Sequence, residues 1–389
     1  MKLRIGLVGL GTGGRSLPQA VAKTTGFTFV AGADLRQEAR AQYNREFGIQ
    51  TFESVEAMCG LRDLDAVYVA TPNPFHAEHA IAALQAGKHV MVEKPMALTL
   101  EDCDRMIAAA ERSRVKLMVA HTRSWNAPIR KMREIIVSGR LGRVTQVHTL
   151  RYSPWLLRPR EAVEIDTALG GGVCYRQAPH QVDIARLLGG GLVESVRAHA
   201  GRWSAENNTE GNYSALLQFE GGVTATLVYD GYGYFDDREF IEGDVFGGER
   251  RSGPGQRLRE ARAAGKLDKN TSRSGIAFDI ERGDGDANKR PRQPFFGITL
   301  VSCERGALRQ SSDGVFLYDA QGRSEVPCQR WDGPLKVELD EFHRAVTQDQ
   351  PMPHDGKWGK ATLEVCLAIL KSSRDQREQR LFHQVESPY

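Results

Sequence analysis

The sequence contains no stretch of about 18 uninterrupted apolar residues, the length that a membrane-spanning helix requires. Charged residues, among them Glu93, Arg105 and Glu364, interrupt its most apolar segments. We therefore expect no membrane association. The apolar part of the amino-terminal segment is short, and glycines and Arg15 interrupt it. This pattern disfavours a secretion signal and favours a cytoplasmic location.

Cysteine is also scarce, with six residues in a chain of 389. No two of them form a CxxC pair, and their spacing matches neither a disulfide framework nor a usual zinc site. We therefore expect reduced thiols and no bound metal ion.

Excess charge is small, because 52 Lys and Arg residues face 49 Asp and Glu residues, for a net charge of +3. Residues 249–292 depart from this balance with 12 basic and 7 acidic side chains. We predict a charged insertion over about 243–295, either solvated or serving as an active-site lid or a subunit-contact arm. Few aromatic residues lie among these charges to stack on bases, so we expect no nucleic-acid partner.

The chain length fits two domains, which we expect at 1–121 and 122–389. Residues 1–121 alternate short apolar runs with amphipathic segments, which is typical of an α/β fold with a doubly wound parallel sheet. The expected strands are Leu3–Val8, Thr28–Ala33, Asp65–Ala70, Lys88–Val92 and Lys116–Ala120. The helical patterns lie near Arg15–Lys23, Gln37–Glu46, His76–Ala86 and Leu100–Arg112.

A glycine-rich loop follows the first expected strand and satisfies the GxGxxG spacing. Glycines at these positions permit a tight turn and the close approach of a pyrophosphate to backbone N–H groups. We expect this loop to bind a dinucleotide through Gly9, Gly11, Thr12, Gly13 and Gly14.

Asp34 ends the second expected strand, about 20 residues beyond the loop, where a carboxylate accepts hydrogen bonds from a ribose diol. This position favours NAD over NADP, because a carboxylate repels a 2′-phosphate. Arg36 leaves NADP open, since its guanidinium could instead pair with that phosphate.

Two further segments carry a specific resemblance, Thr71-Pro72-Asn73-Pro74-Phe75-His76-Ala77-Glu78-His79 and Ala86-Gly87-Lys88-His89-Val90-Met91-Val92-Glu93-Lys94-Pro95-Met96-Ala97-Leu98-Thr99. With the glycine loop they resemble the signature of the Gfo/Idh/MocA family of nicotinamide-dependent oxidoreductases. The resemblance places Lys94 beside the nicotinamide and the substrate. It implies further cofactor contacts at Thr71, Pro72, Asn73, His76, Glu93, His121 and Arg123.

The position of Lys94 agrees with this role on physical grounds. Ligands of open α/β sheets bind beyond the carboxyl ends of the strands, and Lys94 follows the expected strand Lys88–Val92. A partly desolvated ammonium near a cationic nicotinamide has a lowered pKa and can join a proton relay. We therefore expect Lys94 to be catalytic.

The second half alternates apolar and polar residues in several short runs, from Val144–Tyr152 to Val315–Tyr318. This pattern predicts an α+β domain with a large, mostly antiparallel sheet. Family members use the open face of such a sheet to assemble, so the resemblance implies a homodimer or homotetramer.

The glycine run at 170–172 precedes the second catalytic candidate, His180. In the family an aspartate commonly follows such a run, with a histidine four residues later and an aspartate three beyond that. His180 and Asp183 match this pattern, whereas Arg176 replaces the first aspartate. The spacing predicts that all three share one helix face, with His180 as general base.

Arg176 suggests a carboxylated substrate, because guanidinium binds carboxylates in a two-pronged geometry. A structural ion pair is the alternative for this residue. The remaining candidates for substrate binding are Tyr175, Asp183, Arg158 and Arg160.

Segments 175–183, 231–236, 301–304 and 354–358 are similar to the phthalate 4,5-cis-dihydrodiol dehydrogenase branch of the family. The resemblance implies NAD(P)-dependent oxidation of a cyclic alcohol or cis-dihydrodiol that carries carboxylate. Two alternatives stay open. One is a sugar or cyclitol dehydrogenase, and the other is a non-catalytic NAD-binding sensor or regulatory subunit.

Overall fold

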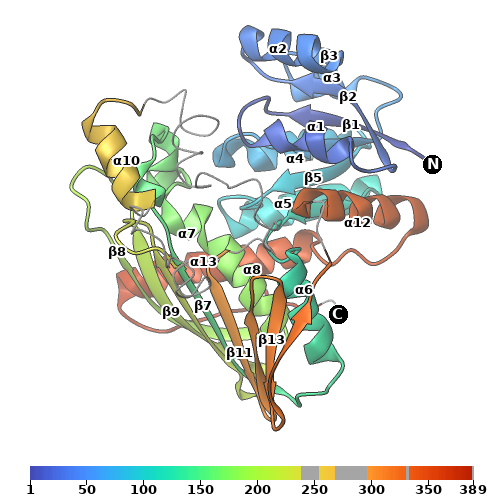
Figure 1. The fold of residues 1–389 in the computed structure, drawn as a ribbon. Helices are drawn as coiled ribbons and strands as arrows, with labels where there is room; N and C mark the ends of the chain where they lie inside the picture. The colour runs from blue at the N-terminus through green and yellow to red at the C-terminus, as the bar shows by residue number, and fades with distance from the viewer. Residues whose placement is uncertain (238–253, 268–295, 330–332, 388–389) are drawn as a thin grey trace. The chain divides into compact units, whose positions relative to one another are not determined.

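The computed structural model describes residues 1–237, 254–267, 296–329 and 333–387, which form two compact units (Figure 1). The first unit contains residues 1–125 and 333–364, and the second contains residues 126–329 and 365–387. This division differs from the single boundary expected after residue 121, because a late segment of the chain returns to the first unit. No helix in the described ranges has the length and hydropathy to cross a membrane.

The first unit is built on a six-stranded sheet in the order β3-β2-β1-β4-β5-β6, with every neighbouring pair parallel. This arrangement confirms the doubly wound sheet. The strands are β1 (Leu3–Val8), β2 (Phe27–Ala33), β3 (Gln50–Phe52), β4 (Ala66–Val69), β5 (His89–Glu93) and β6 (Leu117–Ala120). The helices are α1 (Leu17–Val21), α2 (Gln37–Phe47), α3 (Val55–Cys59), α4 (His76–Gln85), α5 (Leu100–Ser113) and α12 (Pro334–Gln348).

The strand sequences explain this layering. β4 and β6 are buried along their whole length, as expected for parallel strands covered by helices on both faces. Helix α5 begins at Thr99, whose side chain accepts a hydrogen bond from the Asp102 backbone N–H at 3.1 Å. The short β3 and α3 were not predicted, because three to five residues carry little periodicity.

The returning segment 333–364 joins the first unit through specific contacts. Thr24 donates a 2.7 Å hydrogen bond to Asp340 of α12. The Val119 N–H of β6 donates to the His354 carbonyl at 2.8 Å, and Met118 and Asp355 form an antiparallel bridge. The edge strand β6 therefore gains a partner from a residue more than 200 positions away.

The second unit is built on a nine-stranded sheet in the order β14-β13-β12-β11-β7-β10-β9-β8-β15. β7 and β10 are parallel and the other neighbours are antiparallel, which confirms the mostly antiparallel prediction. The strands are β7 (Val144–Tyr152), β8 (Val193–Gly201), β9 (Asn212–Phe219), β10 (Thr224–Asp230), β11 (Ile298–Cys303), β12 (Gly306–Gln310), β13 (Gly314–Asp319), β14 (Gly322–Pro327) and β15 (Gln379–Arg380).

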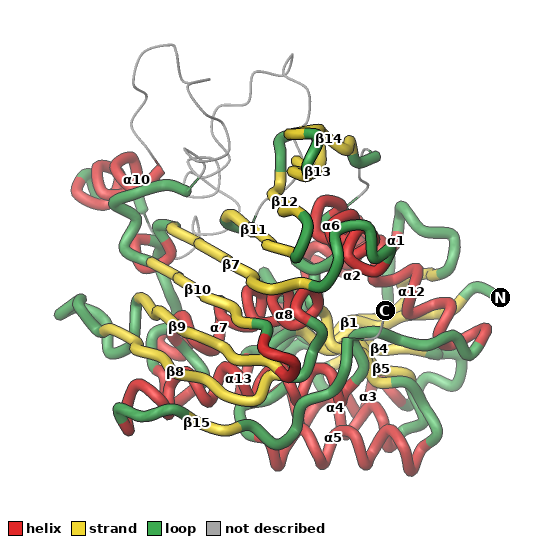
Figure 2. The backbone as a smooth tube through the Cα atoms, turned by 90° about the horizontal axis from the view of Figure 1, so that it is seen from below, coloured by secondary structure: helices red, strands yellow, loops and turns green. Residues whose placement is uncertain are grey.

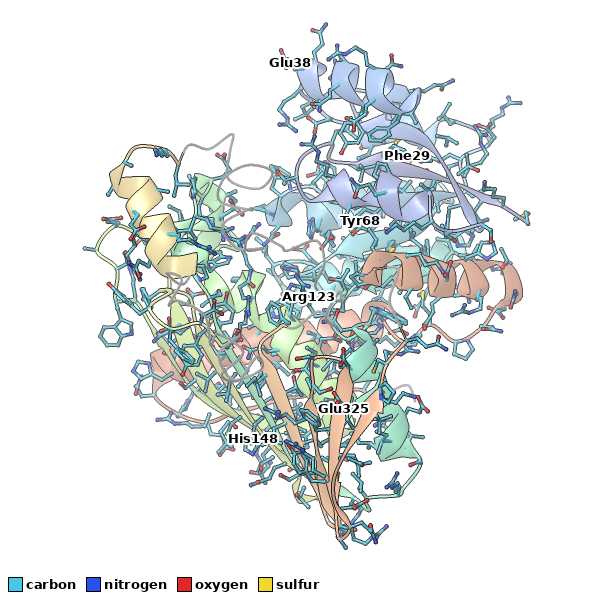
Figure 3. All side chains as sticks on the ribbon, viewed as in Figure 1. Phe29, Glu38, Tyr68, Arg123, His148 and Glu325 are labelled. Atoms are coloured by element: carbon cyan, nitrogen blue, oxygen red, sulfur yellow. The ribbon has the colours of Figure 1, made fainter. Side chains whose placement is uncertain are left out.

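Helices lie against one face of this sheet, whereas no described helix covers β7 to β10 on the other (Figure 2). His148 of β7 is directed away from the helices and contacts Thr226 of β10 (Figure 3). The helices are α6 (Ala127–Val137), α7 (Gly172–Arg176), α8 (Ala178–Gly189) and α13 (Gly356–Asp375), of which residues 365–375 belong to this unit.

The predicted charged insertion is described in part. Its helix α10 (Pro254–Ala263) anchors to the second unit through Arg259, whose guanidinium donates to the Tyr232 carbonyl at 2.9 Å. The rest of the insertion, 243–253 and 268–295, lies outside the described residues. The expectation that the insertion is an active-site lid or a subunit-contact arm therefore stays a prediction.

Candidate active site

The glycine loop follows β1 and has the close approaches that its glycines predict. Gly9 has a φ of +91°, and a Cβ there would lie 2.7 Å from the Ala70 carbonyl oxygen. A Cβ on Gly14 would lie 2.7 Å from the Gly9 carbonyl oxygen. Side chains are therefore excluded at both positions, and Thr12 and Gly13 are exposed between them. The loop fits a dinucleotide that is held by backbone groups.

Asp34 lies beside this loop at the end of β2. Its carboxylate accepts a hydrogen bond from the Leu10 N–H at 2.9 Å and a bidentate pair from the Arg36 side chain at 3.0 and 2.9 Å. Burial by itself would raise the pKa of this carboxyl group. The hydrogen bonds and the charge of Arg36, together with the Leu10 N–H, outweigh burial, and the pKa lies below its ordinary value. Asp34 is therefore ionised and suited to accept hydrogen bonds from ribose hydroxyls.

The turns after β4 and β5 are tied together by His76. Its Nδ1 lies 2.8 Å from the Pro95 carbonyl oxygen and its Nε2 lies 2.8 Å from the Thr71 carbonyl oxygen. His76 is buried and therefore holds the backbone at the predicted cofactor turn. The contact expected between this imidazole and the cofactor itself stays a prediction, as do those of Pro72, which is exposed, and Asn73, which is buried.

Lys94 immediately follows β5, and the preceding residue, Glu93, is held by a hydrogen bond from a neighbouring strand. The buried Tyr68 of β4 (Figure 3) donates its hydroxyl hydrogen to the Glu93 carboxylate at 2.6 Å. Burial raises the pKa of Tyr68, and the charges of Glu93 and Glu338 raise it further. Tyr68 therefore stays protonated as a donor, which fixes the end of the strand that carries Lys94.

His121 and Arg123 follow β6 in the first unit. His121 is buried, and its ring centroid lies 5.7 Å from that of His354 on the returning segment. Ser124 connects the two, because its hydroxyl donates to the His121 carbonyl at 2.9 Å and lies 3.0 Å from the His354 Nε2. The sequence motif 354–358 is thereby placed against this turn.

In the second unit, three charged side chains form what we call the arginine cluster, which consists of Arg160, Glu164 and Arg176. The Arg176 Nη2 lies 2.8 Å from the Glu164 Oε1, and the Arg160 Nη1 lies 3.5 Å from the same oxygen. The side chains are buried or nearly so, with 18% exposure for Arg176 and 8% for Glu164. Two guanidinium groups therefore contact one carboxylate oxygen.

The expectation that Arg176 shares one helix face with His180 and Asp183 is wrong. Arg176 is the last residue of α7, and Gln177 interrupts the helix with φ −120° and ψ −40°. Pro179 is in the first turn of α8 and has no N–H with which to continue a helix from α7. Arg176 therefore points from a separate helix.

His180 and Asp183 belong to the nearly fully buried helix α8. His180 is 7% exposed, and its ring makes an edge-to-face contact with Phe296 at a centroid distance of 4.7 Å. Asp183 is completely buried. Tyr175, on α7, has a pKa raised by burial to about 12, so its phenol is neutral at physiological pH.

Arg158 and Arg160 precede the glycine run, and both lie within electrostatic range of the buried Tyr229 hydroxyl. The Arg160 guanidinium also stacks 4.2 Å from the Trp155 ring centroid and donates to the Trp155 carbonyl. The loop is therefore held in a defined shape.

Sequence reasoning missed three charged residues of this region, Arg151, Glu164 and Asp237. Arg151 contacts the ring of Phe296 and donates to the buried Asp237 at 2.9 Å. Burial raises the pKa of Asp237, although Arg151 opposes this effect. The available signal was weak. Arg151 ends an alternating strand, where a polar residue is ordinary, and its partner is 86 residues away.

In the described ranges, no group of three or more His, Cys, Asp or Glu side chains is arranged to hold a metal ion. No disulfide joins the six cysteines, all of which lie in the described ranges, and Cys59, Cys103, Cys174 and Cys366 are buried.

Comparison with known proteins agrees with this architecture. Residues 3–121 match the GFO_IDH_MocA model, described as an oxidoreductase family with an NAD-binding Rossmann fold. Residues 129–244 match a GFO/IDH/MocA C-terminal domain. The chain belongs to the Gfo/Idh/MocA family. As a member of this family of oxidoreductases it has NAD as its cofactor, and the glycine loop and Asp34 fit that dinucleotide.

Among its relatives, a Comamonas testosteroni protein named 1-carboxy-3-chloro-3,4-dihydroxycyclohexa-1,5-diene dehydrogenase is 36% identical over 96% of both chains. Inositol 2-dehydrogenase 2 of Saccharopolyspora erythraea is 32% identical over 63% of this chain and 72% of its own. A crystal structure from Bordetella bronchiseptica RB50, provisionally named a dehydrogenase, superposes with a TM-score of 0.85. It is 36% identical, with 98% of this chain and 100% of that chain covered.

Proposed function

We propose that this family member is a dehydrogenase of cyclic cis-diols that carry a carboxylate. The arginine cluster is the observation that carries the proposal. Guanidinium groups bind carboxylates in a two-pronged geometry, so the largely buried Arg160 and Arg176 side chains are suited to a substrate that carries a carboxylate. The relative from Comamonas testosteroni supports this, since its name specifies a carboxylated dihydrodiol and it is similar over nearly the whole chain.

The glycine loop and Asp34 would hold the dinucleotide, whose nicotinamide serves as the hydride acceptor when bound. In the proposed reaction, the carbinol C–H bond of the substrate breaks with transfer of hydride, and the hydroxyl proton passes to the His180 imidazole. The family resemblance also gives Lys94 a catalytic role beside the nicotinamide.

The substrate ring adds its own driving force to this reaction. Oxidation of one carbinol of a cyclohexadiene cis-diol gives an enone, which tautomerises to a catechol. Aromatisation then draws the oxidation forward, and the protein needs only to orient the ring and accept the first proton.

We further propose a cytoplasmic homodimer or homotetramer that assembles through the uncovered sheet face. A row of apolar side chains, Ile298, Leu150 and Val228, crosses three neighbouring strands in register on that face. Leu216 of β9 is 48% exposed. Ile298, Leu150 and Val228 are half-buried. Apolar residues that lie side by side and are partly exposed mark interaction surfaces. Light scattering of the purified protein would test the assembly.

A substrate panel tests the catalytic proposal. NAD reduction is measured with carboxylated cis-dihydrodiols, the matching cis-dihydrodiols without carboxylate, and myo-inositol. We expect kcat/KM for a carboxylated diol to exceed that for its neutral analogue by at least about tenfold. This factor corresponds to the free energy of one hydrogen bond to a charged group. Turnover of inositol together with no turnover of any carboxylated diol would contradict the proposal and favour a cyclitol dehydrogenase.

A further inference from the structure

Glu210 is a buried residue, 7% exposed, whose side chain contacts the first turn of α7. Its Oε1 accepts a hydrogen bond from the Cys174 N–H at 2.9 Å, and its backbone carbonyl accepts one from the Val173 N–H at 3.4 Å. The first N–H groups of a helix have no partner within the helix, so Glu210 supplies two of the acceptors that they need. Because α7 has only five residues and ends at Arg176, these contacts fix the helix that carries Arg176.

The same carboxylate reaches the segment that carries Glu164. The Thr167 hydroxyl donates to the Glu210 Oε2 at 2.6 Å, and the Thr209 hydroxyl lies 3.2 Å from this oxygen. Thr167 follows Glu164 by three residues in the chain. Glu164 and Arg176 form the 2.8 Å ion pair of the arginine cluster. Glu210 therefore connects the two segments from which this ion pair comes.

Glycine at position 172 leaves the space that this carboxylate occupies. Gly172 has a φ of +79°, and a Cβ there would overlap the Glu210 carboxylate and the Thr209 hydroxyl. Any larger residue would therefore push the carboxylate away from the first turn of α7. The last glycine of the run at 170–172 and the carboxylate at 210 thus depend on each other.

We propose that Glu210 is a positioning residue for the arginine cluster, which holds α7 against the Glu164 segment so that Arg176 meets the substrate carboxylate in one fixed orientation. This inference rests on the proposed function, in which Arg176 recognises that carboxylate. Two-pronged binding of a carboxylate requires a guanidinium of defined orientation. Loss of Glu210 should therefore weaken substrate binding more than the hydride transfer itself.

Hydrogen exchange of the whole protein tests the position of α7 without any substrate. Mass spectrometry follows the peptide that covers residues 172–177. Exchange should be at least about tenfold faster in Glu210→Ala, because Cys174 loses its acceptor, and within about threefold of the parent in Glu210→Gln, whose amide oxygen can still accept. Ser372→Ala is the matched control, since it removes the acceptor of the buried Ala198 N–H in the same unit. Unchanged exchange of the peptide in Glu210→Ala would overturn the proposal.

Gly172→Ala tests the same contact while Glu210 stays in place. Its methyl group should displace the carboxylate and speed up exchange of the peptide as Glu210→Ala does. Gly221→Ala is the control, because Gly221 has a similar φ of +75° and no atom lies within 4 Å of its Cβ position. Equally fast exchange of the peptide in both glycine variants would mean that backbone strain alone is responsible, and would refute the role of the carboxylate.

Steady-state kinetics tests whether Glu210 acts through Arg176. In Glu210→Ala, KM for a carboxylated cis-diol should rise at least about tenfold, while its kcat and both constants of the neutral analogue stay within about threefold. In the Arg176→Gln background, Glu210→Ala should cause no further loss. An equal loss in both backgrounds would overturn the proposal. A parent protein that uses both diols equally well would contradict the proposed function instead, and the exchange data would still decide whether Glu210 holds α7.

Discussion

Replacement of Arg176 by glutamine should separate carboxylate recognition from the rest of catalysis. The Arg176 guanidinium is 18% exposed and contacts Glu164 at 2.8 Å, so any substrate carboxylate would meet it in a partly desolvated setting. A hydrogen bond to a charged group contributes about 1.5–3 kcal/mol. We therefore expect Arg176→Gln to lower kcat/KM for a carboxylated diol about 10- to 150-fold, and to change turnover of the neutral analogue little.

The same substitution should reduce stability, because it removes the 2.8 Å contact between Arg176 and the buried Glu164. A buried carboxylate that loses a partner costs about 1–3 kcal/mol. The double variant Arg176→Gln/Glu164→Gln removes both charges and should recover much of this loss in chemical denaturation, but not the activity. Arg143→Gln is the control, since its pair with Glu304 is exposed and should contribute at most about 1 kcal/mol.

Steady-state kinetics with both diols decide the matter. If Arg176→Gln reduced kcat/KM equally for the carboxylated and the neutral substrate, Arg176 would not recognise the carboxylate. If the double variant regained both stability and activity, the loss in the single variant would come from unfolding alone, and the reasoning from charge would fail.

Three other predictions concern the remaining parts of the molecule. Lys94→Ala should reduce kcat at least about 100-fold, while the NAD affinity measured by calorimetry stays within about threefold of that of the parent protein. If the parent protein itself showed no turnover, the protein would instead be an NAD-binding sensor. Gly14→Ala should weaken NAD binding more than about tenfold, since its Cβ would lie 2.7 Å from a carbonyl oxygen and a Leu7 methyl group; unchanged affinity would exclude a tight loop. Burial raises the pKa of Cys103 to about 12, so iodoacetamide should modify the half-buried Cys303 and Cys328 first, and mass spectrometry would contradict this if Cys103 reacted as fast.

Much of the first unit could be predicted from the sequence, because its signals are short-range. The bounds of β1 follow directly from the apolar run Leu3–Val8, and the glycine loop, Asp34 and Lys94 all follow strand ends. In a parallel sheet the carboxyl ends of neighbouring strands share one edge, so a pattern of strands and turns already places these residues on that edge. The family signature strengthened the same conclusion.

Helical spacing failed at the second site for an equally physical reason. A period of 3.6 residues relates Arg176 to His180 only if the helix is continuous, and the break at Gln177 before Pro179 removes that condition. The proline was visible in the sequence and was the one signal that could have predicted the break.

The sequence by itself determined which chemical groups are available and which strand ends and loops carry them. Tertiary structure decided how those groups are paired: Arg36 with the carboxylate expected to hold ribose, Glu164 between Arg160 and Arg176, and Arg151 with Asp237. Which charged side chains form ion pairs depends on which of them lie close together in the folded chain and on how deeply they are buried. Local periodicity does not encode them, because residues 86 positions apart become neighbours only when the sheet has formed.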